Sequence, residues 1–96
     1  MTVDHRLAAQ ERITELTTLL QSSGDPGNAA IVAECEALAR AIAAFHMEGI
    51  RFRIYNVDRL LRPPAVPPEG ATSLLEEARK HLEAAGFHTR SHQSPV

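Results

Sequence analysis

The side chains best suited to chemistry gather in one stretch, "IRFRIYNVDRLLR", residues 50–62. If residues 50–57 form a β-strand, Arg51, Arg53 and Tyr55 project from one face, with the two arginine Cα atoms about 6.6 Å apart. Guanidinium groups placed in this way can hold a phosphate, a carboxylate or an acidic partner. In the competing interpretation these arginines belong to a solvated face of the protein or form ion pairs with the carboxylates of acidic helices. The candidate anion- or partner-binding residues are Arg51, Arg53, Tyr55, Arg59 and Arg62.

The charge distribution sets this stretch apart from the rest of the chain. Residues 49–62 carry four arginines against one aspartate, whereas residues 1–48 carry seven acidic and three basic side chains. The formal net charge of the 96 residues is −2. A chain so close to neutral, with only one short basic segment, lacks the charge distribution typical of nucleic-acid-binding proteins. Nucleic-acid binding is therefore the weakest of the alternatives.

The histidines and the single cysteine do not combine into a metal or catalytic motif. His88 and His92 are four residues apart, which suits a metal only on a helix; along a strand their Cα atoms would lie about 13 Å apart. The chain has no HExxH sequence and no CxxC pair. Cys35 lies on an apolar stripe about three helical turns from His46, which disfavours a nucleophilic group of these two with Glu48. We expect no metal and no cofactor.

The first half of the chain predicts a hairpin of two amphipathic helices. The apolar residues of the first helix, residues 3–22, fall on one stripe, and "SSGDPGN" contains the turn formers that end it. The second helix is predicted over residues 28–48, with apolar residues at spacings of 4, 3, 4 and 3. These residues form its expected core or oligomer face: Ile31, Cys35, Leu38, Ile42 and Phe45.

The segment after Gly49 has two interpretations. If the helix continued, its apolar stripe would have to rotate by about a quarter turn at the glycine. The alternation in "IRFRIY", rich in β-formers, instead favours a strand over residues 50–57, with Gly49 following the end of the helix. The alternative is an all-α fold in which one long, kinked second helix covers residues 28–62.

The second half of the chain continues with a connector and a third helix. Four prolines in "RPPAVPPEGA" predict an extended connector over residues 63–71. A helix is expected over 73–85, followed by a short strand over 87–92 and a frayed end at 93–96. The predicted fold is therefore α+β, mostly helical, with residues 1–96 forming a single domain.

No motif specifies a reaction, so the expected function rests on surface chemistry. A thin, alanine-rich core favours a homo-oligomer, with a dimer preferred. We expect a small non-enzymatic interaction or regulatory module that contacts an acidic partner through residues 51–62. The alternative is a small enzyme or anionic-ligand-binding protein with a site at a subunit interface. The single cysteine and the lack of an apolar leader or membrane span favour the cytoplasm, and the preference for arginine over lysine indicates a GC-rich bacterial genome.

Overall fold

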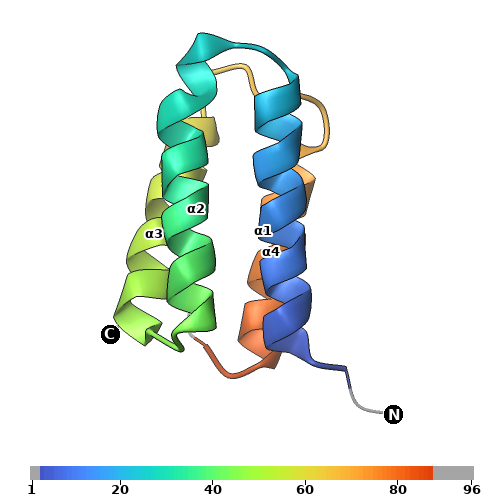
Figure 1. Cartoon of the computed structure of the whole chain (residues 1–96), viewed down its shortest axis with the longest axis vertical. Coiled ribbons are helices and arrows are strands. Elements are labelled where there is room, and N and C mark those ends of the chain that lie inside the picture. The colour runs from blue at the N-terminus through green and yellow to red at the C-terminus, as the bar shows by residue number, and fades with distance from the viewer. Residues whose placement is uncertain (1–2, 88–96) are drawn as a thin grey trace.

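The computed structural model describes residues 3–87, and within this range the chain forms helices joined by short turns and one longer connector. The helices run alternately up and down, as in an antiparallel bundle (Figure 1). A single 3₁₀ turn, Pro26–Asn28, precedes the second helix. The four α-helices are α1 (His5–Ser22), α2 (Ala29–Ala43), α3 (Met47–Leu61) and α4 (Ala71–Ala84).

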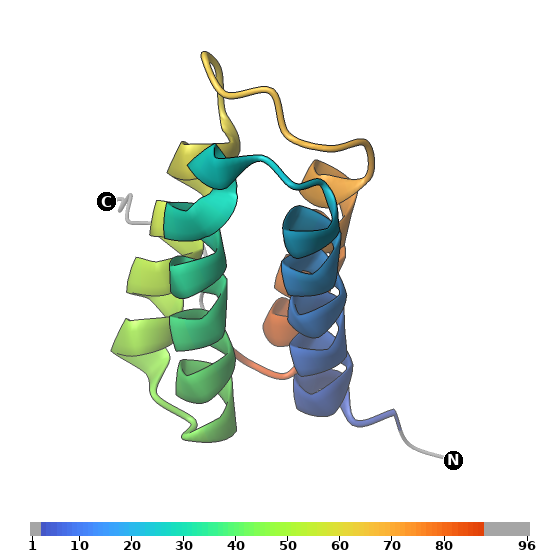
Figure 2. The ribbon, with the colours of Figure 1, turned by 45° about the horizontal axis from the view of Figure 1, so that its top comes forward.

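The four helices form two pairs, α1 beside α4 and α2 beside α3 (Figures 1 and 2). The contact between α1 and α4 is the largest, and α1 also packs along α2, which joins the two pairs. The contact between α3 and α4 is the smallest of the four helix–helix contacts. As a result, α3 is held in the bundle mainly by α2.

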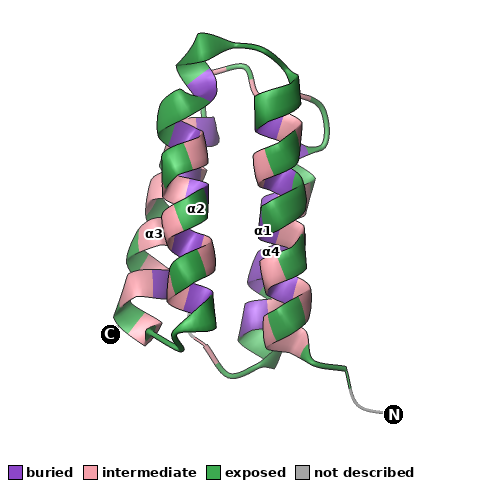
Figure 3. Cartoon of the chain, in the orientation of Figure 1, coloured by how far each residue is buried: buried purple, intermediate pink, exposed green. Residues whose placement is uncertain are grey.

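Each helix contributes one apolar stripe to a common core (Figure 3). Asp4 caps α1 by accepting a hydrogen bond from the Leu7 amide at 3.0 Å, which satisfies an amide that has no partner inside the helix. The stripe predicted for the first helix is buried as expected, and the stripes of the other helices meet it in the interior. The buried residues of α1 are Ala9, Ile13, Leu16 and Leu20, and those of α3 are Ile50, Ile54, Val57 and Leu61.

The prediction of a strand over residues 50–57 is wrong, because this segment lies inside α3. The "IRFRIY" alternation spans only six residues, whereas the buried positions of α3 recur at spacings of 4, 3 and 4 from Ile50 to Leu61. This longer pattern is helical. Phe52, which a strand would bury beside Ile50 and Ile54, is exposed instead. The predicted α+β fold is therefore corrected to an all-helical one for residues 3–87.

The all-α alternative has the right class, but its single kinked helix over 28–62 is interrupted by a turn. The helix α2 ends at Ala43, and Phe45 takes the left-handed conformation with φ of 57°. The amides of Phe45 and His46 donate to the carbonyls of Ile42 and Ala41, which is the Schellman pattern of a helix end. The turn resets the helical phase, and this accounts for the quarter-turn slip in the apolar pattern.

A new helix begins immediately after this turn. The His46 Nδ1 accepts a hydrogen bond from the Gly49 amide at 2.8 Å and so caps α3. A Cβ on Gly49 would lie 2.6 Å from this nitrogen. Gly49 therefore lies in the first turn of α3 and permits the cap, and the predicted end of the second helix at residue 48 is five residues too late.

The last helix begins at Ala71, two residues before the predicted start, and follows Gly70, whose φ is 93°. It ends as expected: Gly86 has φ of 98°, and the Phe87 amide donates to the Leu82 carbonyl at 2.9 Å. Phe87 is not part of a strand and packs against the core. The rest of the strand predicted over 87–92, and the frayed end predicted at 93–96, lie outside the described residues.

No helix within residues 3–87 combines the length and the apolar character that crossing a membrane requires.

Candidate interaction surface

The helical conformation of α3 separates the arginines that a strand would have placed together. Residues two apart on a helix are about 200° apart around its axis, so Arg51 and Arg53 point in different directions. The Arg51 Nη1 lies 3.7 Å from a carboxylate oxygen of Glu48 on the same helix. The Arg53 Nη1 lies 3.0 and 3.2 Å from the two carboxylate oxygens of Glu34, on α2.

Glu34 is the centre of a polar contact between α2 and α3. The Asn56 side-chain amide donates to Glu34 Oε1 at 3.2 Å, beside the Arg53 contact. Burial by itself would raise the pKa of Glu34, but the hydrogen bonds from Asn56 and Arg53, together with the charges of Arg53 and Arg59, outweigh it and lower this pKa below its ordinary value of 4.5. The Arg53 guanidinium thus serves to hold two helices together.

The two remaining arginines of the set differ in their surroundings. Arg62 pairs with Asp58 of the preceding turn, through Nε at 3.1 Å and Nη2 at 2.6 Å. Arg59 forms no ion pair with any of residues 3–87, and its guanidinium lies 5.9 Å from the centre of the Tyr55 ring. Three of the four arginines are therefore neutralised locally, and Arg59 is the one whose charge remains available.

Two large aromatic side chains lie on the solvent side of α3, one turn apart. Phe52 and Tyr55 each have 56 % of their surface exposed. The Arg53 guanidinium lies 5.1 Å from the Phe52 ring centre, so each of the two rings has an arginine over it. The sequence analysis missed Phe52 because the strand pattern assigned it to the buried face; the helical spacing of Ile50 and Ile54 places it opposite.

These residues belong to a second periodic stripe on α3, opposite the buried one. We call it the outer stripe: Glu48, Phe52, Tyr55, Arg59 and Arg62. The first four recur at spacings of 4, 3 and 4, which keeps them on one face of the helix, and all five are exposed. The outer stripe contains Tyr55, Arg59 and Arg62 of the predicted site, while Arg51 and Arg53 lie to its sides.

The predicted core or oligomer face of α2 is divided in the structure. Ile31, Cys35, Leu38 and Ile42 are buried in the core of the chain itself, so they are not available for association of folded copies. Phe45 is 64 % exposed in the turn after α2, where the Arg6 guanidinium lies 4.4 Å from its ring centre.

The arrangement around Cys35 and His46 does not support nucleophilic chemistry. Burial raises the pKa of the Cys35 thiol to about 12, so the thiol stays protonated near neutral pH. The His46 ring is engaged as the cap of α3, and Glu48 is directed to Arg51. The buried thiol acts as a small apolar side chain of the core.

The structure brings together one pair of histidines that sequence spacing could not show. His5 at the start of α1 and His81 near the end of α4 are 76 residues apart, and their Nδ1 atoms lie 2.9 Å from each other. In this contact one ring nitrogen donates and the other accepts. No group of three or more His, Cys, Asp or Glu residues able to hold a metal occurs within residues 3–87.

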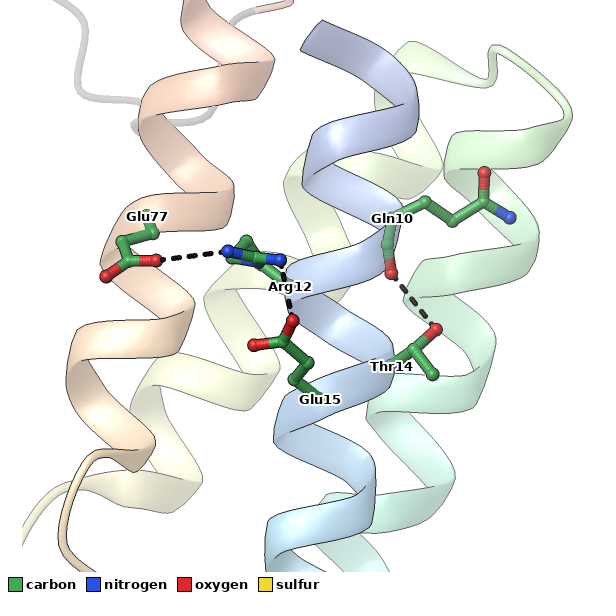
Figure 4. A network of polar contacts seen from close by, with 5 residues as sticks. All are labelled: Gln10, Arg12, Thr14, Glu15 and Glu77. Carbon is green, nitrogen blue, oxygen red and sulfur yellow. Dashed lines mark hydrogen bonds and ion pairs between the residues drawn. The ribbon is translucent and has the colours of Figure 1, made fainter. Parts of the chain in front are cut away.

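Several side chains on the outer side of α1 make polar contacts within the helix and with α4. Arg12 pairs with Glu15 at 2.6 Å and reaches Glu77 of α4 at 3.8 Å, while the Thr14 hydroxyl donates to the Gln10 carbonyl at 3.1 Å (Figure 4). Gln10, Arg12, Thr14 and Glu15 line a shallow hollow beside α1. The contact between Arg12 and Glu77 ties α1 to α4, while the buried Arg12 Nε has no hydrogen-bond partner within residues 3–87.

The comparisons with known proteins give no relative from which a site could be transferred. The chain matches no family model, no curated protein and no solved structure at a significant level.

Proposed function

We propose that this chain is a non-enzymatic interaction module that contacts a protein partner through the outer stripe of α3. The observation that carries the proposal is the exposure of Phe52 and Tyr55, one turn apart on a helix whose opposite face is fully buried. Large aromatic side chains grouped on the solvent side of a helix are typical of contact surfaces.

The composition of the outer stripe also supports a protein contact. Tyrosine and arginine are enriched among the residues that contribute most to binding, since they combine a large apolar body with a polar end. Tyr55 and Arg59 are adjacent, and burial of the pair against a partner would strengthen their cation–π contact. The partner surface that fits is apolar, with a carboxylate placed to meet Arg59.

The ion pairs of α3 narrow the chemistry of the partner further. Because Arg51, Arg53 and Arg62 already face carboxylates, the segment does not act as a broad positive surface. Binding that depended on bulk charge would have to break these pairs. We therefore propose that recognition depends on the two aromatic rings and on the charge of Arg59.

The test is site-specific photo-crosslinking of the full-length chain in its native host. A benzophenone amino acid replaces Tyr55, and the matched control carries it at Thr18, an exposed position of α1. The expected result is a discrete protein adduct from position 55 that is at least tenfold weaker from position 18, and that is lost when Phe52→Ala is added. If position 55 gives no more adduct than position 18, the proposed function is refuted.

The free charge of Arg59 favours a second candidate, in which the same surface binds a small anionic ligand. An anionic metabolite would then raise the melting temperature at constant ionic strength, and Arg59→Gln would abolish the shift. Arg12→Gln, which removes an arginine already paired with Glu15, is the matched control. A shift that survives Arg59→Gln would eliminate this candidate.

A further inference from the structure

Building on the function proposed above, we propose that the partner of the outer stripe is a second copy of this chain. The two α3 helices would lie antiparallel about a twofold axis that crosses the helix midway between residues 53 and 54. A twofold axis uses the same surface of both copies, so the surface must be complementary to itself. The outer stripe has this property.

The positions of the two aromatic residues make the outer stripe complementary to itself. Phe52 and Tyr55 are equally far from the midpoint between residues 53 and 54, on opposite sides of it. In an antiparallel pair, Phe52 of each copy therefore lies at the height of Tyr55 of the other. The two contacts flank the axis and place four aromatic rings at the centre of the interface, where contact residues contribute most.

The charged residues satisfy the same symmetry. Glu48 and Arg59 are also equally far from the midpoint, about 8 Å along the helix axis on either side of it. Glu48 of each copy then faces Arg59 of the other, giving two ion pairs at the ends of the aromatic centre. Glu48 can exchange Arg51 for Arg59 of the other copy because its side chain is 79 % exposed and its 3.7 Å contact with Arg51 is a weak surface ion pair.

The charges also determine the direction of pairing. In a parallel pair Glu48 would face Glu48 and Arg59 would face Arg59, so that both contacts would be repulsive. The spacing of 4, 3 and 4 from Glu48 to Arg59 is the one by which helix side chains interdigitate in coiled coils. The spacing therefore fits a pair of helices, and the charges favour the antiparallel arrangement of that pair.

No other helix face within residues 3–87 offers the same combination. The large hydrophobic side chains exposed in this range are Val3, Leu7, Phe45, Phe52, Tyr55 and Val66. Of these, only Phe52 and Tyr55 lie on one helix, a single turn apart. The symmetric pairing of charges about them therefore selects α3 as the contact helix.

The interface is small, and the expected dimer is correspondingly weak. Each aromatic ring has about 100 Å² of accessible surface to bury, given that slightly more than half of it is exposed. The total surface that four rings and four charged side chains can bury is smaller than the roughly 1,200 Å² that stable complexes bury. We expect a dissociation constant of about 10–500 μM, so that the chain is monomeric when dilute and dimeric when concentrated.

The test is sedimentation equilibrium of the full chain between 5 and 500 μM at low salt. Glu48→Arg and Arg59→Glu should each weaken dimerisation at least tenfold, because each puts two like-charged contacts into the dimer. The chain that carries both substitutions restores opposite charges only in the antiparallel arrangement, so its dissociation constant should return to within about threefold of the original. An equimolar mixture of the two single variants should form a heterodimer. The matched control is Glu11→Arg with Lys80→Glu, on α1 and α4, which should change nothing.

Each outcome separates this proposal from the one it depends on. A chain that stays monomeric at 500 μM, a dimer indifferent to Arg59→Glu, or single variants that are not rescued in combination would overturn self-association, provided that circular dichroism shows the variants folded. If crosslinking at position 55 then yields an adduct with a different protein, the proposed function survives without the dimer. An adduct of two identical chains supports both proposals.

Discussion

Replacing Glu34 by glutamine tests the polar contact between α2 and α3 and should destabilise the protein in a pH-dependent manner. The ion pair with Arg53 is partly exposed and contributes about 0.5–1 kcal/mol, and its hydrogen bond with Asn56 contributes a similar amount. Glutamine keeps a neutral acceptor, so the expected loss near pH 7 is about 1 kcal/mol. For a domain of this size that corresponds to about 4–8 °C in melting temperature.

The sign of the pH dependence follows from the lowered pKa of Glu34. A carboxyl whose pKa is lower in the folded state than in the unfolded chain stabilises the fold fully above the ordinary value of 4.5. This stabilisation is lost as the pH falls through the lowered pKa, where the folded carboxylate becomes protonated. The difference in unfolding free energy between the original chain and Glu34→Gln should therefore be constant above about pH 5.5 and shrink below pH 4.5.

The assay is urea denaturation followed by circular dichroism from pH 3 to pH 8. Glu36→Gln, an exposed position of the same helix, is the matched control and should change the unfolding free energy by less than about 0.5 kcal/mol at every pH. A double-mutant cycle with Arg53→Met should give a coupling of about 0.5–1 kcal/mol at pH 7. A difference that stays the same from pH 3 to pH 8, or a coupling of zero, would refute the role given to Glu34.

Four further predictions concern stability and reactivity. Ile54→Ala should cost about 2–5 kcal/mol in urea denaturation while Phe52→Ala costs less than about 0.5, because only the first side chain is buried; equal costs would contradict the helical assignment of this segment. Cys35 should resist iodoacetamide at pH 8 until the protein unfolds, and rapid labelling of the native protein would show that the thiol is accessible. Phe45→Gly should raise the unfolding free energy by about 0.5–1 kcal/mol, since glycine adopts φ of 57° without strain; a lower free energy would show that the contact with Arg6 matters more. Arg79→Met should leave stability unchanged or raise it by about 1 kcal/mol, because the buried Arg79 Nε has no hydrogen-bond partner within residues 3–87, and a loss above 1 kcal/mol would indicate a partner.

The helices could be predicted from the sequence wherever no shorter, competing pattern overlapped the apolar stripe. The stripes of α1 and α2 each extend over three turns, and the sequence pattern predicts all of their buried residues. It also predicts Phe45 on the stripe of α2, but Phe45 is exposed in the turn after that helix. In α3 the six-residue alternation of "IRFRIY" competed with a helical stripe of twelve residues, and the shorter pattern was preferred because Gly49 suggested a helix end. The residue that ends α2 in the left-handed conformation is Phe45, a type that rarely adopts it.

The candidate site was less accessible to sequence analysis, because its properties depend on contacts between helices. The excess of arginine in residues 49–62 is real, but the sequence does not show that Glu34, on another helix, neutralises Arg53. The same is true of His5 and His81, which meet only because α1 and α4 pack side by side. The outer stripe could have been found once α3 was known to be a helix, since its spacing is visible in the sequence.

The large contact between α1 and α4 has a consequence for synthesis of the chain on the ribosome. Among the helices within residues 3–87, the one made first finds its main neighbour in the one made last, about 60 residues later. At about 5–20 residues per second, part of the apolar stripe of α1 remains uncovered for roughly 3–12 s, with only α2 available to shield it. Truncation within α4 would leave part of that stripe uncovered in every chain, so we expect such truncated chains to aggregate more readily than the original one.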